Sequence, residues 1–128
     1  MPKQEIKSAN AQRAIGPYSQ AVRSGNFLFL SGQIPIDHAT GELIAGNVEA
    51  QTKQVLRNVE GLLKAAGLGP QHVVKATVYL TDLSAFGEMN GVYGGFFSAP
   101  YPARSTVEVK GLPKGSMVEI DVMAMFGE

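Results

Sequence analysis

The 128-residue sequence has 11 basic and 11 acidic side chains, a formal net charge of zero, and no cysteine. Disulfides, thiolate nucleophiles and zinc–thiolate sites are therefore excluded, and the balanced charge without a basic run is unlike that of a nucleic-acid-binding protein. No apolar stretch approaches the roughly 20 residues of a membrane helix, and the segment MPKQEIKSANAQ lacks the apolar core of a signal peptide. We therefore expect a single domain over residues 1–128, located in the cytoplasm.

The first predicted element is a β-hairpin. Residues 19–23 and 27–33 are strand-like and flank the turn sequence Ser24-Gly25-Asn26. The second strand contains FLFL at 27–30, which is apolar on both faces. Residues 35–44 (PIDHATGELI) follow as a turn-rich connection.

A helix is predicted to begin after Asn47, whose side chain can cap its N-terminus. Glu49 suits the first turn, where the helix dipole favours an acid. Gly67 can end the helix in a left-handed conformation, so that Leu68 folds back on Leu63. The stripe predicted to face the core consists of Val48, Thr52, Val55, Leu56, Val59, Leu62, Leu63 and Ala66.

A strand at 72–80 and a second helix beginning near Asp82 come next. The strand has Val74, Ala76, Val78 and Leu80 on one face, and the helix has an apolar stripe of Leu83, Phe86, Met89, Tyr93, Phe96 and Phe97. The helix also contains Gly87, Gly91, Gly94 and Gly95, each costing about 1 kcal/mol relative to alanine. These glycines either admit a close neighbour or leave the helix mobile, and the sequence leaves both open.

Strands at 102–109 and 117–126, joined by the turn GLPKG, complete an α+β domain. One face of the last strand is apolar (Val118, Ile120, Val122, Ala124, Phe126), and the other carries Met117, Glu119, Asp121, Met123 and Met125. Two helices joined by one strand can cover only one face of a sheet. We therefore expect a second copy of the protein to cover the other face, with Glu119 and Asp121 partly buried near the boundary.

Arg104 is the first candidate for a functional side chain. It follows Pro102 on the polar side of its strand, opposite Val107 and Val109. A guanidinium is a planar fork of donors that can hold a carboxylate in a two-pronged contact. The structural alternative is a salt bridge to Glu108 or Glu119.

Two further candidates are Glu119 and Tyr18. Glu119 lies between apolar residues on a strand that should be central, where it could act as an acid or base or pair with a buried cation. Burial would raise its pKa and Arg104 would lower it, and the sequence does not decide between them. Tyr18 follows the turn Gly16-Pro17, which would orient its ring toward a site; alternatively the ring packs and its hydroxyl is satisfied by backbone.

Other chemistries have little support. His38 and His72 are far apart and lack ligand-spaced companions, so neither a metal site nor a Ser-His-Asp triad is expected. No phosphate-binding glycine spacing is present. The glycine in Ser31-Gly32-Gln33 either allows a ligand to approach the backbone or marks a bulge. The residues alone therefore indicate a self-associating α+β domain with a candidate anion site at Arg104.

Six segments, in order and over nearly the whole chain, closely resemble the RidA family of YjgF-type reactive intermediate deaminases, whose older members were named L-PSP endoribonucleases. They are IGPYSQAV (15–22), FLSGQIP (29–35), EAQTKQVLRNVEGLLKAAG (49–67), VVKATVYLTDL (73–83), PARSTVEV (102–109) and LPKGSMVEIDVMA (112–124). Each segment is a weak signal by itself, and their ordered succession is specific.

The resemblance implies a chorismate-mutase-like α+β fold, with a mixed sheet backed by two helices. It also implies a homotrimer with a central barrel and three active sites in the clefts between subunits. The implied activity is hydrolysis of 2-imino and enamine acids, such as 2-aminoacrylate and 2-aminocrotonate, to 2-oxo acids and ammonia. Pyridoxal-phosphate-dependent dehydratases release these substrates, and the hydrolysis itself needs no cofactor or metal.

The resemblance also implies roles for individual residues. Arg104 matches the arginine that binds the substrate carboxylate, and Glu119 matches the acid that orients water and moves protons. Tyr18 matches a residue of the active site as well. The remaining matched pocket positions are Ser31, Gly32, Phe86, Asn90 and Thr106. Thr106 stands where many members carry cysteine, a departure that bears on substrate preference more than on reaction type.

Two alternative functions remain open at this point. An endoribonuclease would suit the older family name, although metal-free RNA cleavage usually uses a histidine pair and a basic groove. A non-enzymatic trimer that binds small carboxylates or partner proteins would use the same Arg104 pocket.

Overall fold

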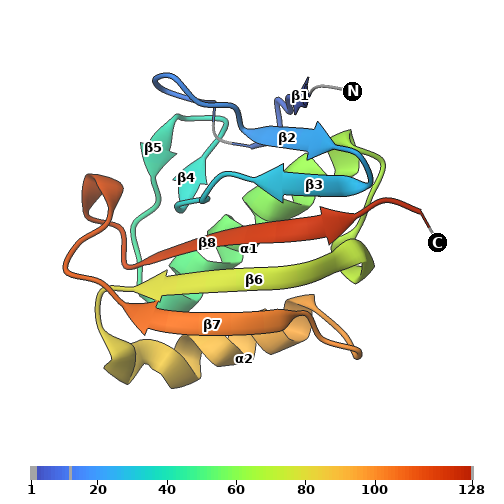
Figure 1. The fold of residues 1–128 in the computed structure, drawn as a ribbon. Coiled ribbons are helices and arrows are strands. Elements are labelled where there is room, and N and C mark those ends of the chain that lie inside the picture. The colour runs from blue at the N-terminus through green and yellow to red at the C-terminus, as the bar shows by residue number, and fades with distance from the viewer. Residues whose placement is uncertain (1–2, 12, 128) are drawn as a thin grey trace.

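The computed structural model describes residues 3–11 and 13–127, and consists of a six-stranded mixed sheet with both helices on one face (Figure 1). The strands are β1 (Gln4–Ile6), β2 (Ala21–Ser24), β3 (Phe27–Leu30), β6 (Val73–Leu80), β7 (Ala103–Glu108) and β8 (Val118–Met125), and the helices are α1 (Val48–Ala65) and α2 (Phe86–Phe96). Their order in the sheet is β1-β2-β3-β8-β6-β7, antiparallel throughout except between β6 and β7. The predicted α+β class is confirmed.

The predicted hairpin is formed by β2 and β3. Leu28 and Leu30 are buried, whereas Phe27 and Phe29 are each 40% exposed, so FLFL is apolar on both faces as expected. The second strand ends earlier than predicted, at Leu30. Three residues later the chain returns to the sheet, where Gln33 exchanges backbone hydrogen bonds of 2.8 and 3.1 Å with Ile120. The predicted connection contains a short hairpin of β4 (Ile36–Asp37) and β5 (Glu42–Leu43).

Helix α1 begins and ends as predicted. The Asn47 side chain accepts a hydrogen bond from the amide of Ala50 at 3.0 Å, Gly67 has a φ of 80°, and the Leu68 amide donates to Leu63 O at 2.8 Å. The predicted stripe is buried, except that Ala66 is only half-buried. Three amide side chains are buried beside it, which the apolar periodicity did not indicate: Gln51, Gln54 and Asn58.

The strand predicted over 72–80 needs one correction. Ala76, Val78 and Leu80 are buried as expected, but Val74 is 41% exposed and Val73 is buried in its place. The reason is a register shift against β8 between Val73 and Lys75, which reverses the alternation at the start of β6.

The second helix also differs from expectation at its start. Asp82 caps a short 3₁₀ turn (Leu83–Ala85), and hydrogen bonds from Ser84 lower the pKa of the Asp82 carboxyl. Leu83 and Phe86 are exposed, whereas Met89, Tyr93 and Phe97 pack into the core. A Cβ built on any of the four glycines of the helix would meet nothing within 4 Å. Within the described chain, no neighbouring atom therefore lies so close to these glycines that a side chain would be excluded.

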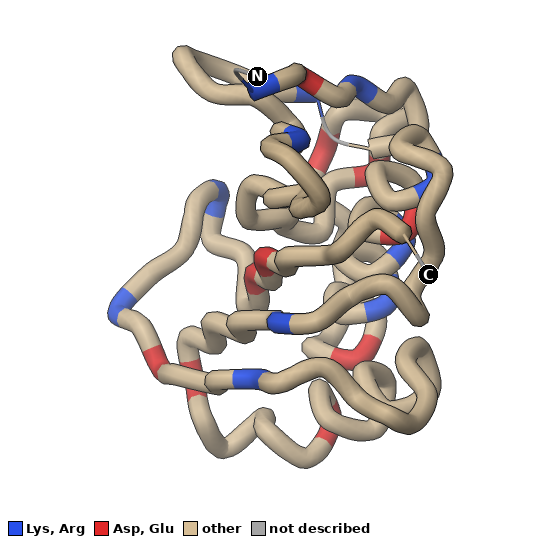
Figure 2. The backbone as a smooth tube through the Cα atoms, turned by 45° about the vertical axis from the view of Figure 1, so that its right-hand side comes forward, with Lys and Arg blue, Asp and Glu red and all other residues tan. Residues whose placement is uncertain are grey.

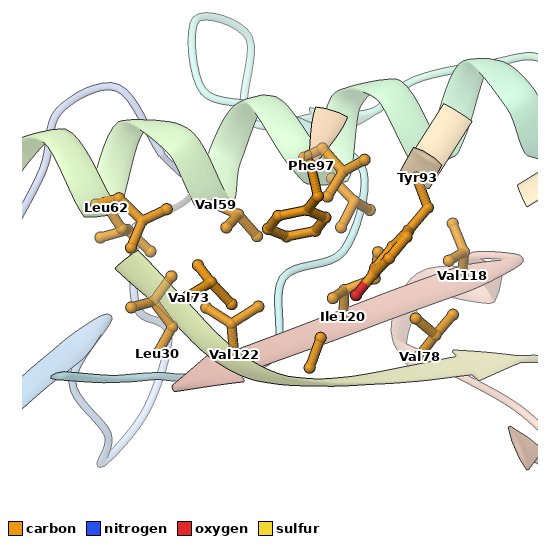
Figure 3. Packing of buried hydrophobic residues seen from close by; sticks show 14 of the residues in the cluster. Leu30, Val59, Leu62, Val73, Val78, Tyr93, Phe97, Val118, Ile120 and Val122 are labelled. Atoms are coloured by element: carbon orange, nitrogen blue, oxygen red, sulfur yellow. The ribbon is translucent and has the colours of Figure 1, made fainter. Parts of the chain in front are cut away.

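The core lies between α1, α2 and the helix-covered face of β6 and β8 (Figure 3). Val118, Ile120, Val122 and Ala124 of β8 are buried on this face, as the alternation predicted. The other face of the sheet, toward the viewer in Figure 1, has no element of the described chain over it. In the described part of the chain no helix is both long and apolar enough to cross a membrane.

Candidate functional site

Arg104 lies on the helix-covered face of β7 and is held by side chains of α2. Its Nη1 donates a hydrogen bond of 2.7 Å to Asn90 Oδ1, and its guanidinium carbon lies 4.6 Å from the ring centre of Tyr93 and 5.4 Å from that of Phe86. Among residues 3–11 and 13–127, no carboxylate forms an ion pair with it. Glu108, one predicted alternative partner, instead accepts a hydrogen bond from the amide of Leu83 at 2.9 Å.

The surroundings of Arg104 form a cavity of about 430 Å³, lined by Asn90, Tyr93, Gly94, Tyr101, Pro102 and Arg104. Thr106 shares the face of β7 with Arg104, and its hydroxyl is buried with no hydrogen-bond partner among the described residues. The buried Tyr93 hydroxyl is also unpartnered there and points toward the sheet (Figure 3). Burial raises the pKa of this hydroxyl, an effect that the Arg104 charge opposes. This group of residues, the Arg104 half-site, thus combines a cation, aromatic walls and unused hydroxyl groups.

Glu119 lies on β8 in a second cavity of about 350 Å³, lined by Tyr18, Ser31, Gly32, Ile34, Pro113 and Glu119. A Cβ on Gly32 would overlap the Glu119 carboxyl group, with Cδ only 2.7 Å away. The absence of a side chain at Gly32 thus lets the Glu119 carboxyl lie directly against the Gly32 backbone. The approach of a ligand to Gly32 stays a prediction. We call this group of residues the Glu119 half-site.

Backbone contacts position the rest of the Glu119 half-site. The Ser31 hydroxyl donates to Ser19 O at 2.6 Å, and the Ser31 amide donates to Gln20 O at 3.0 Å. Tyr18 is 47% exposed, so it does not pack as a core aromatic within the chain. Its hydroxyl accepts a weak hydrogen bond from the Ile15 amide at 3.3 Å, which keeps the ring beside the turn at Gly16.

The electrostatics of Glu119 differ from those of an ordinary surface carboxylate. Burial raises the pKa of the Glu119 carboxyl, and the nearby Asp121 carboxylate raises it further. Within one chain Arg104 lies on the other face of the sheet and does not offset this rise. Asp121 accepts a hydrogen bond of 3.0 Å from Tyr79, and burial together with this bond raises the pKa of Tyr79.

The two half-sites lie on opposite faces of one sheet. Residues paired across strands point to the same face. Arg104 pairs with Ala76, which in turn pairs with Val122, and both partners are buried beneath the helices. Glu119 pairs with Tyr79, three positions further along β6 and hence on the opposite face. The structure therefore brings Tyr18, Ser31, Gly32 and Glu119 together, and brings Arg104 together with Phe86, Asn90 and Thr106, but does not join these two sets within one chain.

Tyr93 and Tyr101 were not singled out as site residues by the sequence, although both line the Arg104 cavity. Tyr93 fits the apolar helix stripe, so its buried hydroxyl has no sequence signal. The two histidines lie apart: His72 Nδ1 accepts from the Gly69 amide at 3.0 Å, and His38 is exposed in the loop between β4 and β5. Among the described residues, no group of three or more His, Cys, Asp or Glu side chains could hold a metal ion.

Comparison with known proteins assigns the chain to a family. The profile of the family described as Endoribonuclease L-PSP matches residues 8–126. The chain belongs to this family. The assignment confirms the resemblance on which the residue-by-residue expectations rest. A RutC family protein of Pyrococcus horikoshii is 50% identical over 122 residues, which are 95% of this chain and 97% of that protein.

Two other proteins similar to this chain carry more specific names. The 2-iminobutanoate/2-iminopropanoate deaminase of Bos taurus is 46% identical over 122 residues, which are 95% of this chain and 89% of the bovine protein. The crystal structure of RidA from an Antarctic Psychrobacter superposes with a TM-score of 0.92 at 45% identity, covering 96% of this chain and 99% of that chain. The predicted RidA-type arrangement of sheet and helices is confirmed by this match.

Proposed function

We propose that this protein hydrolyses 2-imino and enamine acids to 2-oxo acids and ammonia, in sites formed between the subunits of a homotrimer. The observation that carries the proposal is the separation of Arg104 and Glu119 onto opposite faces of the sheet. One chain offers a cation without an ion-pair partner in its described part, and the facing chain would offer Glu119 in a cavity that Tyr18 also lines. The name of the bovine relative supports the choice of substrate class.

The proposed chemistry needs no group beyond these side chains. Arg104 would hold the substrate carboxylate through the guanidinium donors that Asn90 does not use. Glu119 and Tyr18 of the facing chain would place a water molecule against the iminium carbon. Addition of this water, with one of its protons passing to the Glu119 carboxylate, gives a carbinolamine. Glu119 would then return that proton to the amine nitrogen. As the C–N bond breaks, the hydroxyl proton of the carbinolamine would pass back to Glu119, so that the 2-oxo acid forms and the leaving ammonia carries the last proton away as ammonium. A carboxyl group with a raised pKa suits both the accepting and the donating step.

A coupled assay tests this function. Threonine dehydratase generates the 2-imino acid from threonine, and the purified protein should accelerate the appearance of 2-oxobutanoate without added metal or cofactor. The same assay with serine as the precursor would rank the substrates, which bears on the effect of Thr106. An unchanged rate combined with carboxylate binding at Arg104 would favour the non-enzymatic binding protein, and RNA cleavage that is lost on substitution at the half-sites would favour the endoribonuclease.

Assembly is tested separately. The open face contains exposed or half-buried Phe27, Phe29, Met123 and Met125, which are apolar enough to be covered by another copy. Sedimentation should show a mass of three chains at micromolar concentration. Met123→Asp would bury an unpaired charge and should weaken the assembly, whereas Ala65→Asp, at an exposed position of α1, serves as a control for the added charge. A stable, folded monomer of the parent protein would rule out both the trimer and the shared site.

A further inference from the structure

A third cavity of about 630 Å³ lies beside the Glu119 half-site and is not used by the proposed reaction. Its charged lining residues are all cations, Lys7, Arg13 and Lys114, and His38 lines it as well. No aspartate or glutamate of the described chain lines it, although the whole sequence has as many acidic as basic side chains. Figure 2 shows basic positions near the N-terminus, with an acidic position among them on the backbone outside the cavity lining. An excess of one charge sign in a concave site raises the local concentration of ions of the opposite sign.

The walls of this basic cavity are held by hydrogen bonds. The buried Gln20 side chain accepts from the Ser8 amide at 2.9 Å and donates to Ser8 O at 3.1 Å, which fixes the segment that carries Lys7. On the opposite wall, the Asp37 carboxylate accepts from the Ala39 amide at 2.9 Å and orders the turn that carries His38. Asp37, which lies between the lining residues Ile36 and His38, is therefore engaged in its own turn.

The cavity also has an apolar part. Ala11 and Ile36 are buried at its floor, and Ile15, which is 69% exposed, lines it as well. Ile15 belongs to the same loop as Tyr18, and Lys114 follows Pro113 of the Glu119 half-site. The basic cavity and the Glu119 half-site thus share two loops as a common wall.

We propose that this basic cavity binds a small organic phosphate monoester, with the phosphate held by Lys7, Arg13 and Lys114 and the organic part against Ile15. A phosphomonoester carries a charge of about −1.5 to −2 at neutral pH and three acceptor oxygens, which matches three cations from two loops better than the single charge of a carboxylate does. The site is distinct from the Arg104 cavity, which has one cation and aromatic walls.

Calorimetric titration of the full chain with phenyl phosphate tests the proposal. Phenyl phosphate should bind more tightly than benzoate, and the double substitution Lys7→Gln with Arg13→Gln should weaken its binding about tenfold or more. The matched double substitution Lys53→Gln with Arg57→Gln removes the same two charges from the exposed side of α1, and should change the affinity by less than about twofold. Arg104→Ala should leave phenyl phosphate binding unchanged, so the result does not depend on the proposed function.

A second variant tests phosphate binding independently, in case the double substitution of Lys7 and Arg13 disturbs folding. Ala39→Glu places an acid in the exposed lining without removing a basic residue, and should also abolish binding. Absence of binding by the parent chain would overturn the proposal, as would equal losses in the two double variants or loss in Arg104→Ala. Binding of a single-stranded oligonucleotide that depends on Lys7 and Arg13, without binding of phenyl phosphate, would equally overturn it in favour of a nucleic-acid surface.

Discussion

The two half-sites are held in place by different means. Arg104 lies on the edge strand β7 and is positioned by side chains of α2, through one hydrogen bond and two aromatic rings. Glu119 lies on the central strand β8 and is positioned by backbone, because its carboxyl rests against Gly32 and the next residue, Ile120, exchanges backbone hydrogen bonds with Gln33. Each lacks an ion-pair partner in the described chain. The difference is consistent with the proposed roles, in which Arg104 receives the ligand and Glu119 acts on it.

The largest effect is expected from the arginine. Arg104→Ala should lower turnover by about three orders of magnitude and abolish 2-oxobutanoate binding, because the carboxylate loses its only cation at this half-site. Arg104→Lys keeps the charge but loses the planar fork, and should still cost about tenfold or more. Since Arg104 has no ion pair within the described chain, the thermal unfolding midpoint should shift by no more than a few degrees. Unchanged calorimetric binding of 2-oxobutanoate would show that Arg104 is not the carboxylate site.

The second-largest decrease in turnover is expected from a substitution of Glu119. Glu119→Gln preserves the shape of the side chain and removes its proton transfer, so turnover should fall by about two orders of magnitude. Substrate-carboxylate binding should persist, which would separate the two half-sites by function. Glu60→Gln, on the exposed side of α1, is a suitable control for the loss of a charge. Parent-like turnover of the glutamine variant would reduce Glu119 to a structural residue.

Gly32 offers a sharper probe of backbone positioning. Gly32→Ala would place a Cβ inside the space of the Glu119 carboxyl and displace it, so turnover should fall by about tenfold to a hundredfold. Gly111→Ala is the matched control, because a Cβ there meets nothing within 4 Å. Equal turnover of the two alanine variants would mean that the exact position of the carboxyl does not matter.

The smallest effect is on stability as a function of pH. The raised pKa of Glu119 means that the folded state favours the protonated carboxyl. Its contribution to the free energy of unfolding is therefore fully present below the ordinary glutamate pKa, and is lost as the pH rises through the raised value. Glutamine cannot ionise, so the stability of Glu119→Gln relative to the parent should increase from about pH 4 to pH 8 in urea unfolding. A difference that stays level or falls over this range would contradict the assigned environment.

The sequence predicted the helices and strands where the pattern was local and apolar. The cap at Asn47, the fold-back of Leu68 and the alternation of β8 depend on near neighbours and were all confirmed. The outward Val74 was missed because a register shift depends on pairing with a distant strand. Asn58 was missed because its buried amide donates to Ile34 O and Ile36 O, more than 20 residues away.

For the candidate site, too, the sequence predicted the features that depend on local alternation. The alternation correctly set Arg104 with Thr106 and set Glu119 apart from the core face. It could not show that the polar side of β7 is the side that faces α2, because this depends on the partners that Phe86, Asn90 and Tyr93 provide. The roles of Ser31, Gly32 and Asn90 were available only from the family resemblance.

The most direct test of a site shared between chains is complementation between Arg104→Ala and Glu119→Gln. Each variant alone should be nearly inactive. When equal amounts are unfolded together and refolded, three-quarters of the trimers contain both chains and each of these has one intact site of three, so about a quarter of the parent turnover should return. A symmetric dimer with shared sites would give the same fraction. If Arg104 and Glu119 acted within one chain, every site would lack one of them, and a mixture no more active than the separate variants would contradict the account.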